Sequence, residues 1–241
     1  MKQYISTAKQ AFSLLTLQKS DDNNQPTSLL AQQCVPIVAM LLGLSYYITA
    51  EVILFLSGGA SIRSGLLAAI IITIADAYLD RGQKLASLSW TGQLLEAWQN
   101  KNYEESDITK HYSLMLLNLS LIVKVAALTM LISTAQTSWL MLPVIFASAS
   151  LLSSGSAAKI FQANENIYLP WIIAAIASIP CILISQSLVP VILIGFITFA
   201  LSQALTKLAH KSFNTINRQL ALCLTELSFI ITLLASLLLS R

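Results

Sequence analysis

The stretch Ile70-Ile-Ile-Thr-Ile-Ala-Asp-Ala-Tyr-Leu-Asp80 joins an apolar run, long enough to enter a lipid bilayer, to two carboxylates. In a helix, Asp76 and Asp80 share one face and lie one turn apart. Two like charges held that close repel unless a cation or a proton lies between them. The pair therefore indicates either a divalent-metal site or a carboxyl group that holds its proton. The alternative is two ordinary carboxylates at a hydrated helix end, because Asp-x-x-x-Asp is a short and common pattern.

The composition of the whole chain is that of a membrane protein. Of its 241 residues, 56% are hydrophobic and 10% are charged, whereas soluble domains carry about 25% charged residues. Cys34, Cys181 and Cys223 all fall in apolar segments, which indicates neither a disulfide framework nor a metal cluster. The net charge of +3 is too small to indicate nucleic-acid binding.

Hydrophobic periodicity predicts an all-α fold: a polytopic integral membrane helix bundle of about seven transmembrane helices. We expect residues 1–241 to form a single transmembrane domain, with an amphipathic helix at residues 4–17 lying on the membrane. The fifth and sixth spans are separated only by the region from Gln186 to Pro190, which leaves open a tight hairpin or a re-entrant pair. The predicted spans are 34–56, 62–79, 113–133, 137–153, 167–186, 187–206 and 219–240.

The positive charges predict the orientation of the bundle. Most of the 14 Lys and Arg residues fall in the N-terminal segment and in the loops after the second, fourth and sixth spans. Cytoplasmic loops are enriched in these residues. We therefore expect a cytoplasmic N-terminus, with Asp80 and the longest loop, at about 80–112, on the cytoplasmic side.

Two charged residues fall inside predicted spans, Lys124 in the third and Glu226 in the seventh. A charge at the centre of a bilayer costs roughly 2.5–3.5 kcal/mol, so each needs a partner or a hydrated cavity. Their opposite signs and comparable depths predict that they pair. The pair belongs either to a polar chamber beneath Asp76 and Asp80 or to a structural link between the two helices. His111 falls in a predicted loop, where a lone histidine is usually solvated.

The order of these features resembles the cobalamin synthase family, the integral-membrane adenosylcobinamide-GDP ribazoletransferases, over nearly the whole chain. Ala75-Asp-Ala-Tyr-Leu-Asp80 is similar to the family's Leu-Asp-Gly-Leu-Ala-Asp motif. Ile122-Val-Lys-Val-Ala-Ala-Leu128 resembles its lysine-bearing helix, and Leu224-Thr-Glu-Leu-Ser-Phe229 its Leu-Gly-Glu-Leu-x-Phe segment. In the first span, Cys34-Val-Pro-Ile-Val-Ala-Met-Leu-Leu-Gly43 resembles the family's Phe-Pro-x-x-Gly-x-x-x-Gly.

The chain departs from the family pattern at several positions, among them the Gly-Asp-Thr before the last span, for which Asn214-Thr215 is a loose counterpart. Gln83 stands where an acidic residue is usual, and Asn100 stands where an aspartate is usual unless Asp107 takes its place after a small insertion. Ser154 stands where the arginine of Ser-Arg-Gly-Thr-Ala is usual. These departures favour one alternative function, a catalytically eroded relative that serves as a membrane scaffold or partner subunit.

The resemblance implies a transferase that joins adenosylcobinamide-GDP to α-ribazole or its phosphate and releases GMP, in a bacterial-type inner membrane. Its implied cofactor is Mg²⁺, and its partners are the corrinoid nucleotide, α-ribazole and the lipid bilayer. No nucleic-acid partner is expected, and a homo-oligomer is left open. The implied site residues are Asp76 and Asp80 for the metal; Lys124, Glu226 and His111 for catalysis; and Asn100, Asp107 and Ser154 for substrate contact.

Two further alternatives are less well supported by the sequence. CDP-alcohol phosphotransferases carry an Asp-Gly-x-x-Ala-Arg lead before the acidic spacing, which this sequence lacks, and prenyltransferases usually carry two aspartate-rich loops where this sequence has one. A small transporter would be expected to show inverted repeats and broken helices. Pro170, Pro180 and Pro190 recur at regular spacing, but the sequence shows no matching second half.

Overall fold

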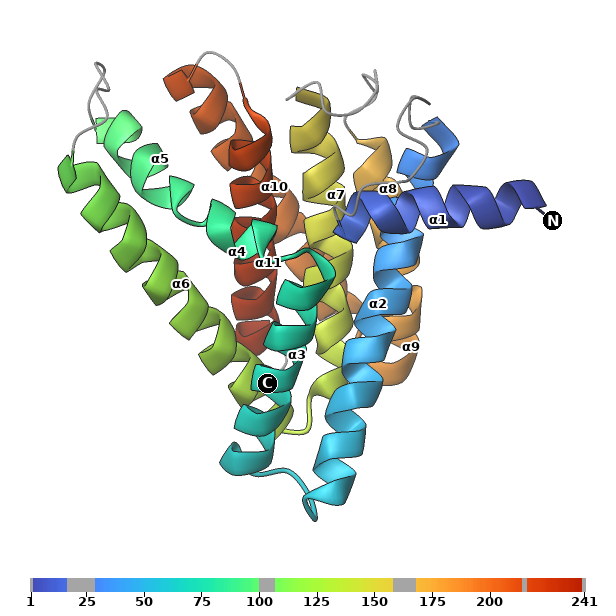
Figure 1. Ribbon diagram of the computed structural model, residues 1–241. Helices are drawn as coiled ribbons and strands as arrows, with labels where there is room; N and C mark the ends of the chain where they lie inside the picture. The colour runs from blue at the N-terminus through green and yellow to red at the C-terminus, as the bar shows by residue number, and fades with distance from the viewer. Residues whose placement is uncertain (1, 17–28, 100–106, 158–167, 214–215, 240–241) are drawn as a thin grey trace.

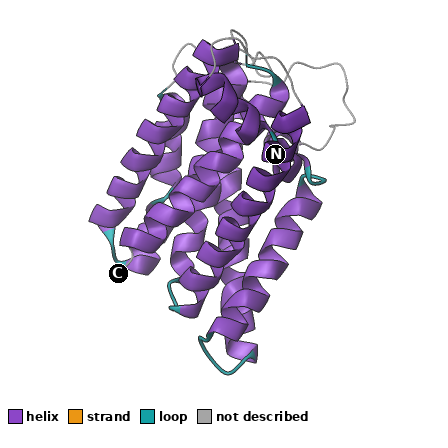
Figure 2. Ribbon diagram, turned by 90° about the vertical axis from the view of Figure 1, so that its left-hand side faces the viewer, coloured by secondary structure: helices purple, strands orange, loops and turns teal. Residues whose placement is uncertain are grey.

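The computed structural model describes residues 2–16, 29–99, 107–157, 168–213 and 216–239, and every element in them is a helix (Figures 1 and 2). The predicted all-α membrane bundle is confirmed. The elements are α1 (Lys2–Thr16), α2 (Leu29–Leu56), α3 (Ile62–Leu79), α4 (Gln83–Ser87), α5 (Trp90–Gln99), α6 (Asp107–Ser133), η1 (Thr137–Leu140), α7 (Met141–Ala157), α8 (Leu169–Ala177), α9 (Ile179–Ser185), α10 (Leu188–Phe213) and α11 (Arg218–Leu239).

Six helices in the described residues are long and apolar enough to cross a membrane: α2, α3, α6, α7 with the short η1 before it, α10 and α11. The fifth predicted span differs, because it consists of the two short helices α8 and α9. Ser178 lies between them, and Pro180 at the start of α9 has no backbone N–H to continue the hydrogen-bond pattern of α8. Gln186, in the left-handed region at φ 53°, then turns the chain into α10. Only Gln186 and Ser187 separate the end of α9 from the start of α10.

Two helices form the centre of the bundle and the others surround them. Of the spanning residues, 94% are buried in η1–α7 and 67% in α11, against 22–39% in α2, α3, α6 and α10. The outer helices expose large apolar side chains, among them Phe55, Ile122 and Phe196. A helix that is apolar on all sides and still exposed is suited to lipid as its surroundings.

Buried hydroxyl groups join the central helices. Ser228 of α11 donates to Ser150 of α7 at 2.9 Å, and Ser150 shares a 2.8 Å hydrogen bond with Ser202 of α10. One turn away along α10 and α11, the hydroxyl oxygens of Thr198 and Thr232 share a hydrogen bond of 3.1 Å. Small residues let membrane helices approach closely, and hydrogen bonds between them stabilise the contact. These hydroxyls therefore help to fix α11, the helix that carries Glu226.

The described part of the predicted loop at about 80–112 packs against the bundle. Helix α4 crosses in front of α11, and α5 leads from there up beside the start of α6 (Figure 1). Leu94 belongs to a small apolar cluster with Leu220 and Leu224 of α11, and the ring of Trp90 packs edge-on against Phe213 at 6.4 Å. At the other side of the same end, α1 lies across α2 and buries Ala11 and Leu15 (Figure 1).

Gly65 sets the distance between α3 and α6. A Cβ atom at this position would lie 2.7 Å from the backbone oxygen of Thr129 and 3.1 Å from the backbone nitrogen of Ser133. Both atoms belong to the α6 backbone or its end, so they cannot move aside as the tip of a flexible side chain can. Glycine at 65 therefore allows the close contact that brings Asp76 and Lys124 within reach of each other.

We expect Gly65→Ala to destabilise the protein by about 1–3 kcal/mol, because the added methyl group must separate two backbones. The measurement is unfolding in mixed micelles followed by circular dichroism. Leu66→Ala is the matched control, since Leu66 is a lipid-facing neighbour on the same helix. Equal stability of the two variants would contradict this account of the contact.

Candidate functional site

Lys124 lies between two carboxylates in the interior of the bundle. Its Nζ atom donates to Oδ2 of Asp76 at 2.8 Å and to Oε1 of Glu226 at 2.6 Å. Lys124 and Glu226 are each 1% exposed and Asp76 is 8% exposed. The predicted pairing of Lys124 with Glu226 is confirmed, and the structure adds Asp76 as a second partner. Three separate helices, α3, α6 and α11, therefore meet at one ammonium group.

Two aromatic side chains complete the surroundings of this ion cluster. The hydroxyl of Tyr46 on α2 donates to Oδ1 of Asp76 at 2.9 Å. The ring of Phe229, one turn along α11 from Glu226, lies with its centroid 4.4 Å from the Lys124 ammonium. A cation over an aromatic face is stabilised by the ring quadrupole, most strongly where water is excluded. Sequence reasoning missed Tyr46, although a tyrosine inside an apolar span usually needs a hydrogen-bond partner.

Asp80 lies at the end of α3, one turn beyond Asp76, and is 1% exposed. Its Oδ1 accepts a 2.8 Å hydrogen bond from the backbone N–H of Gly82, and its Oδ2 lies 3.9 Å from the Nζ of Lys84. Burial raises the pKa of the Asp80 carboxyl group to about 6, with the negative charges of Asp76 and Glu226 adding to the shift and Lys84 opposing it. This buried carboxylate is therefore less completely neutralised than Asp76.

Neither the backbone of His111 nor Ser154 belongs to the ion cluster around Lys124. Helix α6 is continuous from Asp107 to Ser133, so His111 lies roughly 20 Å from Lys124 along the helix axis at about 1.5 Å per residue. The side chains of Asp107 and His111 and the whole of Asn100 lie outside the described residues. The hydroxyl of Ser154 donates to the carbonyl oxygen of Ser150, one turn earlier in the same helix, at 2.8 Å.

Gln83, which stands where the family usually has an acidic residue, contacts α11. The side-chain oxygen of Gln83 accepts a hydrogen bond from Nη2 of Arg218, the first residue of α11, at 3.2 Å. Gln83 thus ties the start of α4 to α11 beside Asp80. Glu51 lies near the C-terminal end of α2, at the end of the bundle away from Asp80. It accepts a hydrogen bond from Thr137 and takes no part in the ion cluster.

Asp76 and Asp80 offer carboxylate oxygens, the type of ligand that Mg²⁺ uses in proteins. Mg²⁺ prefers carboxylate oxygens and usually completes its shell with water and substrate phosphates rather than with protein groups alone. Within the described residues, no group of three or more His, Cys, Asp or Glu side chains is close enough to hold a metal by itself. Asp80, buried and without a cation in hydrogen-bonding contact, is the better donor. Asp76 already holds Tyr46 and Lys124.

No family model, no curated protein and no solved structure matches this chain. The fold and the ion cluster define its class on their own: a polytopic all-α membrane protein with a lysine bridged between carboxylates of two other helices.

Lys124→Met leaves Asp76 and Glu226 buried without their common cation, and we expect it to destabilise the bundle by about 3–5 kcal/mol. Adding Glu226→Gln to that variant should recover part of the loss, because one uncompensated charge is removed. Unfolding in mixed micelles measures both, with the exposed Lys207→Met as the control. Additive losses in the double variant would contradict the coupling of the two side chains.

Proposed function

We propose that the chain is a Mg²⁺-dependent membrane transferase that joins adenosylcobinamide-GDP to α-ribazole or its phosphate and releases GMP. The observation that supports the proposal most is that three residues from separate motifs come together in the folded chain. Asp76, Lys124 and Glu226 stand in three of the motifs that resemble the cobalamin synthase family, and they lie on three different helices. In the folded chain they meet through hydrogen bonds of 2.6–2.8 Å, with Asp80 one turn away on α3.

The reaction fits the chemistry of these groups. An oxygen of α-ribazole or of its phosphate attacks a phosphorus of the diphosphate and a new P–O bond forms. Where the attacking oxygen is a hydroxyl, its proton passes to solvent, and the P–O bond to GMP breaks with its electron pair leaving on GMP. Negative charge grows on the leaving phosphate, and a preorganised cation stabilises such charge strongly where water is excluded. Lys124 is such a cation.

Each residue of the cluster has a distinct part in this proposal. Asp80 and Asp76 would hold Mg²⁺, which when bound neutralises the diphosphate and draws its oxygens to the site. Glu226 orients the Lys124 ammonium group, because its Oε1 is already engaged by that group at 2.6 Å. This arrangement favours the orienting part over that of a general base. Tyr46 positions Asp76 through its 2.9 Å hydrogen bond.

The location of the site in the membrane is part of the proposal. We infer an inner-membrane protein whose N-terminus is cytoplasmic, because the positively charged loops gather on the side of Asp80. Substrates would then reach the cluster from the cytoplasm, at the end of the bundle where α4 and α5 lie. Asp107 and His111 belong to the start of α6, at that same end of the bundle, which suits contact with substrate better than contact with Lys124. Asn100 lies outside the described residues.

A scaffold without catalytic activity is the second candidate, and one observation favours it. The ion cluster is closed: Lys124 and Glu226 are each 1% exposed and satisfy one another, and Asp80, also 1% exposed, is held by the backbone N–H of Gly82. A buried ion network of this kind can serve only to fix the arrangement of helices. In that case Asp80 and Asp76 would bind no metal, and the protein would contribute its surface to a partner.

We expect Asp80→Asn to reduce Mg²⁺-dependent GMP release from adenosylcobinamide-GDP and α-ribazole at least about 100-fold in detergent-purified protein, because the metal loses its principal ligand. Asp76→Asn should act in the same direction but also weaken the bundle, since it removes a partner of Lys124. Glu51→Gln, at the other end of the bundle, is the control.

Two outcomes would contradict the proposal. Wild-type activity that persists in excess EDTA would exclude the part assigned to Mg²⁺. A folded wild-type protein that neither releases GMP nor restores growth to a strain lacking the ribazoletransferase would favour the scaffold.

A further inference from the structure

The phosphate groups of a nucleotide substrate need cations whose N–H groups are free to bind them. Lys124 is already engaged, because its ammonium group donates to Asp76 at 2.8 Å and to Glu226 at 2.6 Å. The ring of Phe229 covers it from a third side, with its centroid 4.4 Å from Nζ. A diphosphate therefore needs at least one further cation to hold it in place.

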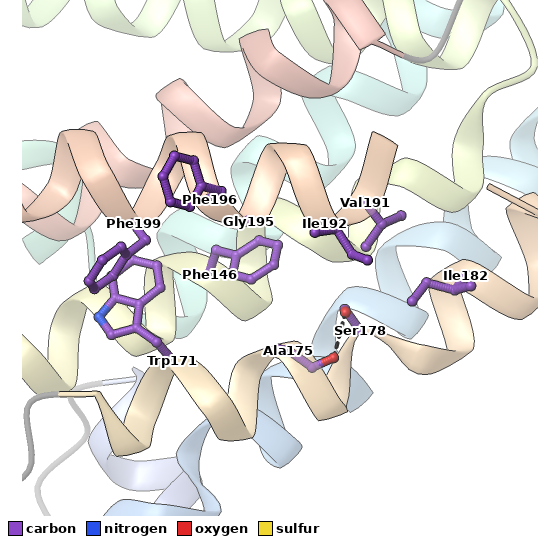
Figure 3. A pocket seen from close by; sticks show the side chains of 10 residues that line it. All are labelled: Phe146, Trp171, Ala175, Ser178, Ile182, Val191, Ile192, Gly195, Phe196 and Phe199. Carbon is purple, nitrogen blue, oxygen red and sulfur yellow. Dashed lines mark hydrogen bonds between the residues drawn. The ribbon is translucent and has the colours of Figure 1, made fainter. Parts of the chain in front are cut away.

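The cavity between α7, the pair α8–α9 and α10 does not supply such a cation (Figure 3). Its volume is about 280 Å³, and none of the described residues that line it is charged. The hydroxyl of Ser178 already donates to the carbonyl oxygen of Ala175 at 2.7 Å. An anion in this cavity would lose its hydration without gaining a counter-charge, which is costly.

Lys84, the second residue of α4, is a buried cation whose donors are free. It is 9% exposed. Its Nζ atom lies 3.9 Å from Oδ2 of Asp80, beyond hydrogen-bonding distance, and it makes no hydrogen bond to any described residue. A lysine ammonium group has three N–H donors, and a buried donor without an acceptor is costly. Lys84 is thus nearly as buried as Lys124 but, unlike Lys124, can still bind a ligand.

Arg218 brings a second cation to the same helix. Its Nη2 donates to the side-chain oxygen of Gln83, the neighbour of Lys84 in α4, at 3.2 Å. The residue is exposed at the start of α11. A guanidinium group has five N–H donors in a planar fork that matches the oxygens of a phosphate. The single hydrogen bond to Gln83 leaves most of these donors available.

The charges in and beside the ion cluster indicate which anion fits. They comprise three carboxylates and three cations: Asp76, Asp80, Glu226, Lys124, Lys84 and Arg218. A bare anion would add negative charge to a balanced set and would lie close to Asp80. A diphosphate that carries a divalent cation adds little net charge, and its metal can bind a carboxylate while its oxygens bind ammonium and guanidinium groups.

We propose that Lys84 and Arg218 bind the diphosphate group of the nucleotide substrate, in the form that carries a divalent cation. This inference rests on the proposed function, because it names the residues that hold the GDP part of the same substrate. The two residues lie on α4 and α11, so the substrate holds these helices together beside Asp80.

The first test measures binding of magnesium pyrophosphate to the detergent-purified protein by isothermal titration calorimetry. We expect Lys84→Gln to weaken binding about 10–100-fold, the effect of one hydrogen bond to a charged group. Arg218→Gln should weaken it at least about threefold, and because Arg218 is exposed this variant keeps the fold.

Lys211→Gln is the matched control for both variants. Lys211 is an exposed residue in the last turn of α10, so its substitution removes the same charge at the same end of the bundle. This variant should bind pyrophosphate as the wild type does. Binding by Lys84→Gln and Arg218→Gln that equals binding by Lys211→Gln would overturn the site, as would a wild type that binds no pyrophosphate.

A second test distinguishes a substrate phosphate from the phosphate of a lipid headgroup. Pyrophosphate binding is repeated in mixed micelles that contain dioleoyl phosphatidic acid. We expect the affinity for pyrophosphate to stay unchanged, because phosphatidic acid carries a single phosphate at the membrane surface. Loss of pyrophosphate binding in these micelles would assign Lys84 and Arg218 to a lipid headgroup and overturn their assignment to the substrate.

Steady-state kinetics separate this inference from the transferase itself. With adenosylcobinamide-GDP as the substrate, Arg218→Gln should raise KM at least about threefold. Turnover by this variant at an unchanged KM would overturn the inference and leave the transferase standing. A wild type without turnover that still binds pyrophosphate through Lys84 would overturn the transferase and support the diphosphate site.

Discussion

One ammonium group buried among helices is the constraint on which the architecture depends. Lys124 is 1% exposed, so its ammonium group is shielded from water. A charge in such surroundings requires counter-ions in contact, and here α3 and α11 supply one each. The positions of these two helices against α6 are thereby fixed in both depth and rotation. The glycine contact at Gly65 and the hydroxyl bonds of Ser150 and Ser228 are what allow them to come so close.

The sequence predicted the spans well and their interruptions poorly, for one physical reason. Apolar runs report which residues meet lipid, so six of the predicted spans correspond to long helices. They do not report where the helix itself begins or ends, and α2, α6 and α10 extend beyond their apolar runs at the end of the bundle that carries Asp80. The break at Ser178 is equally invisible to composition, because its cause is the missing N–H of Pro180.

The candidate site was predictable only as far as charge and depth allow. Opposite signs at similar depths were enough to pair Lys124 with Glu226. Periodicity predicted that Asp76 and Asp80 share one face of α3. It did not predict which way that face points, and in the structure Asp76 points inward to Lys124 of α6. Tyr46 carries no charge, and its contact with Asp76 spans 30 residues of chain between two separate helices. Such a contact depends on how α2 and α3 pack, which no local pattern encodes.

The double partnership of Lys124 also has a consequence for the order in which the chain is made. Lys124 follows Asp76 by 48 residues and precedes Glu226 by 102. Because a chain folds from its N-terminus as synthesis proceeds, the lysine can enter the bilayer already matched with the aspartate. Glu226 arrives 102 residues later, with α11. A nascent chain halted before α11 would therefore keep its membrane-embedded cation beside a single counter-ion, and insertion of α11 is the step that supplies the second.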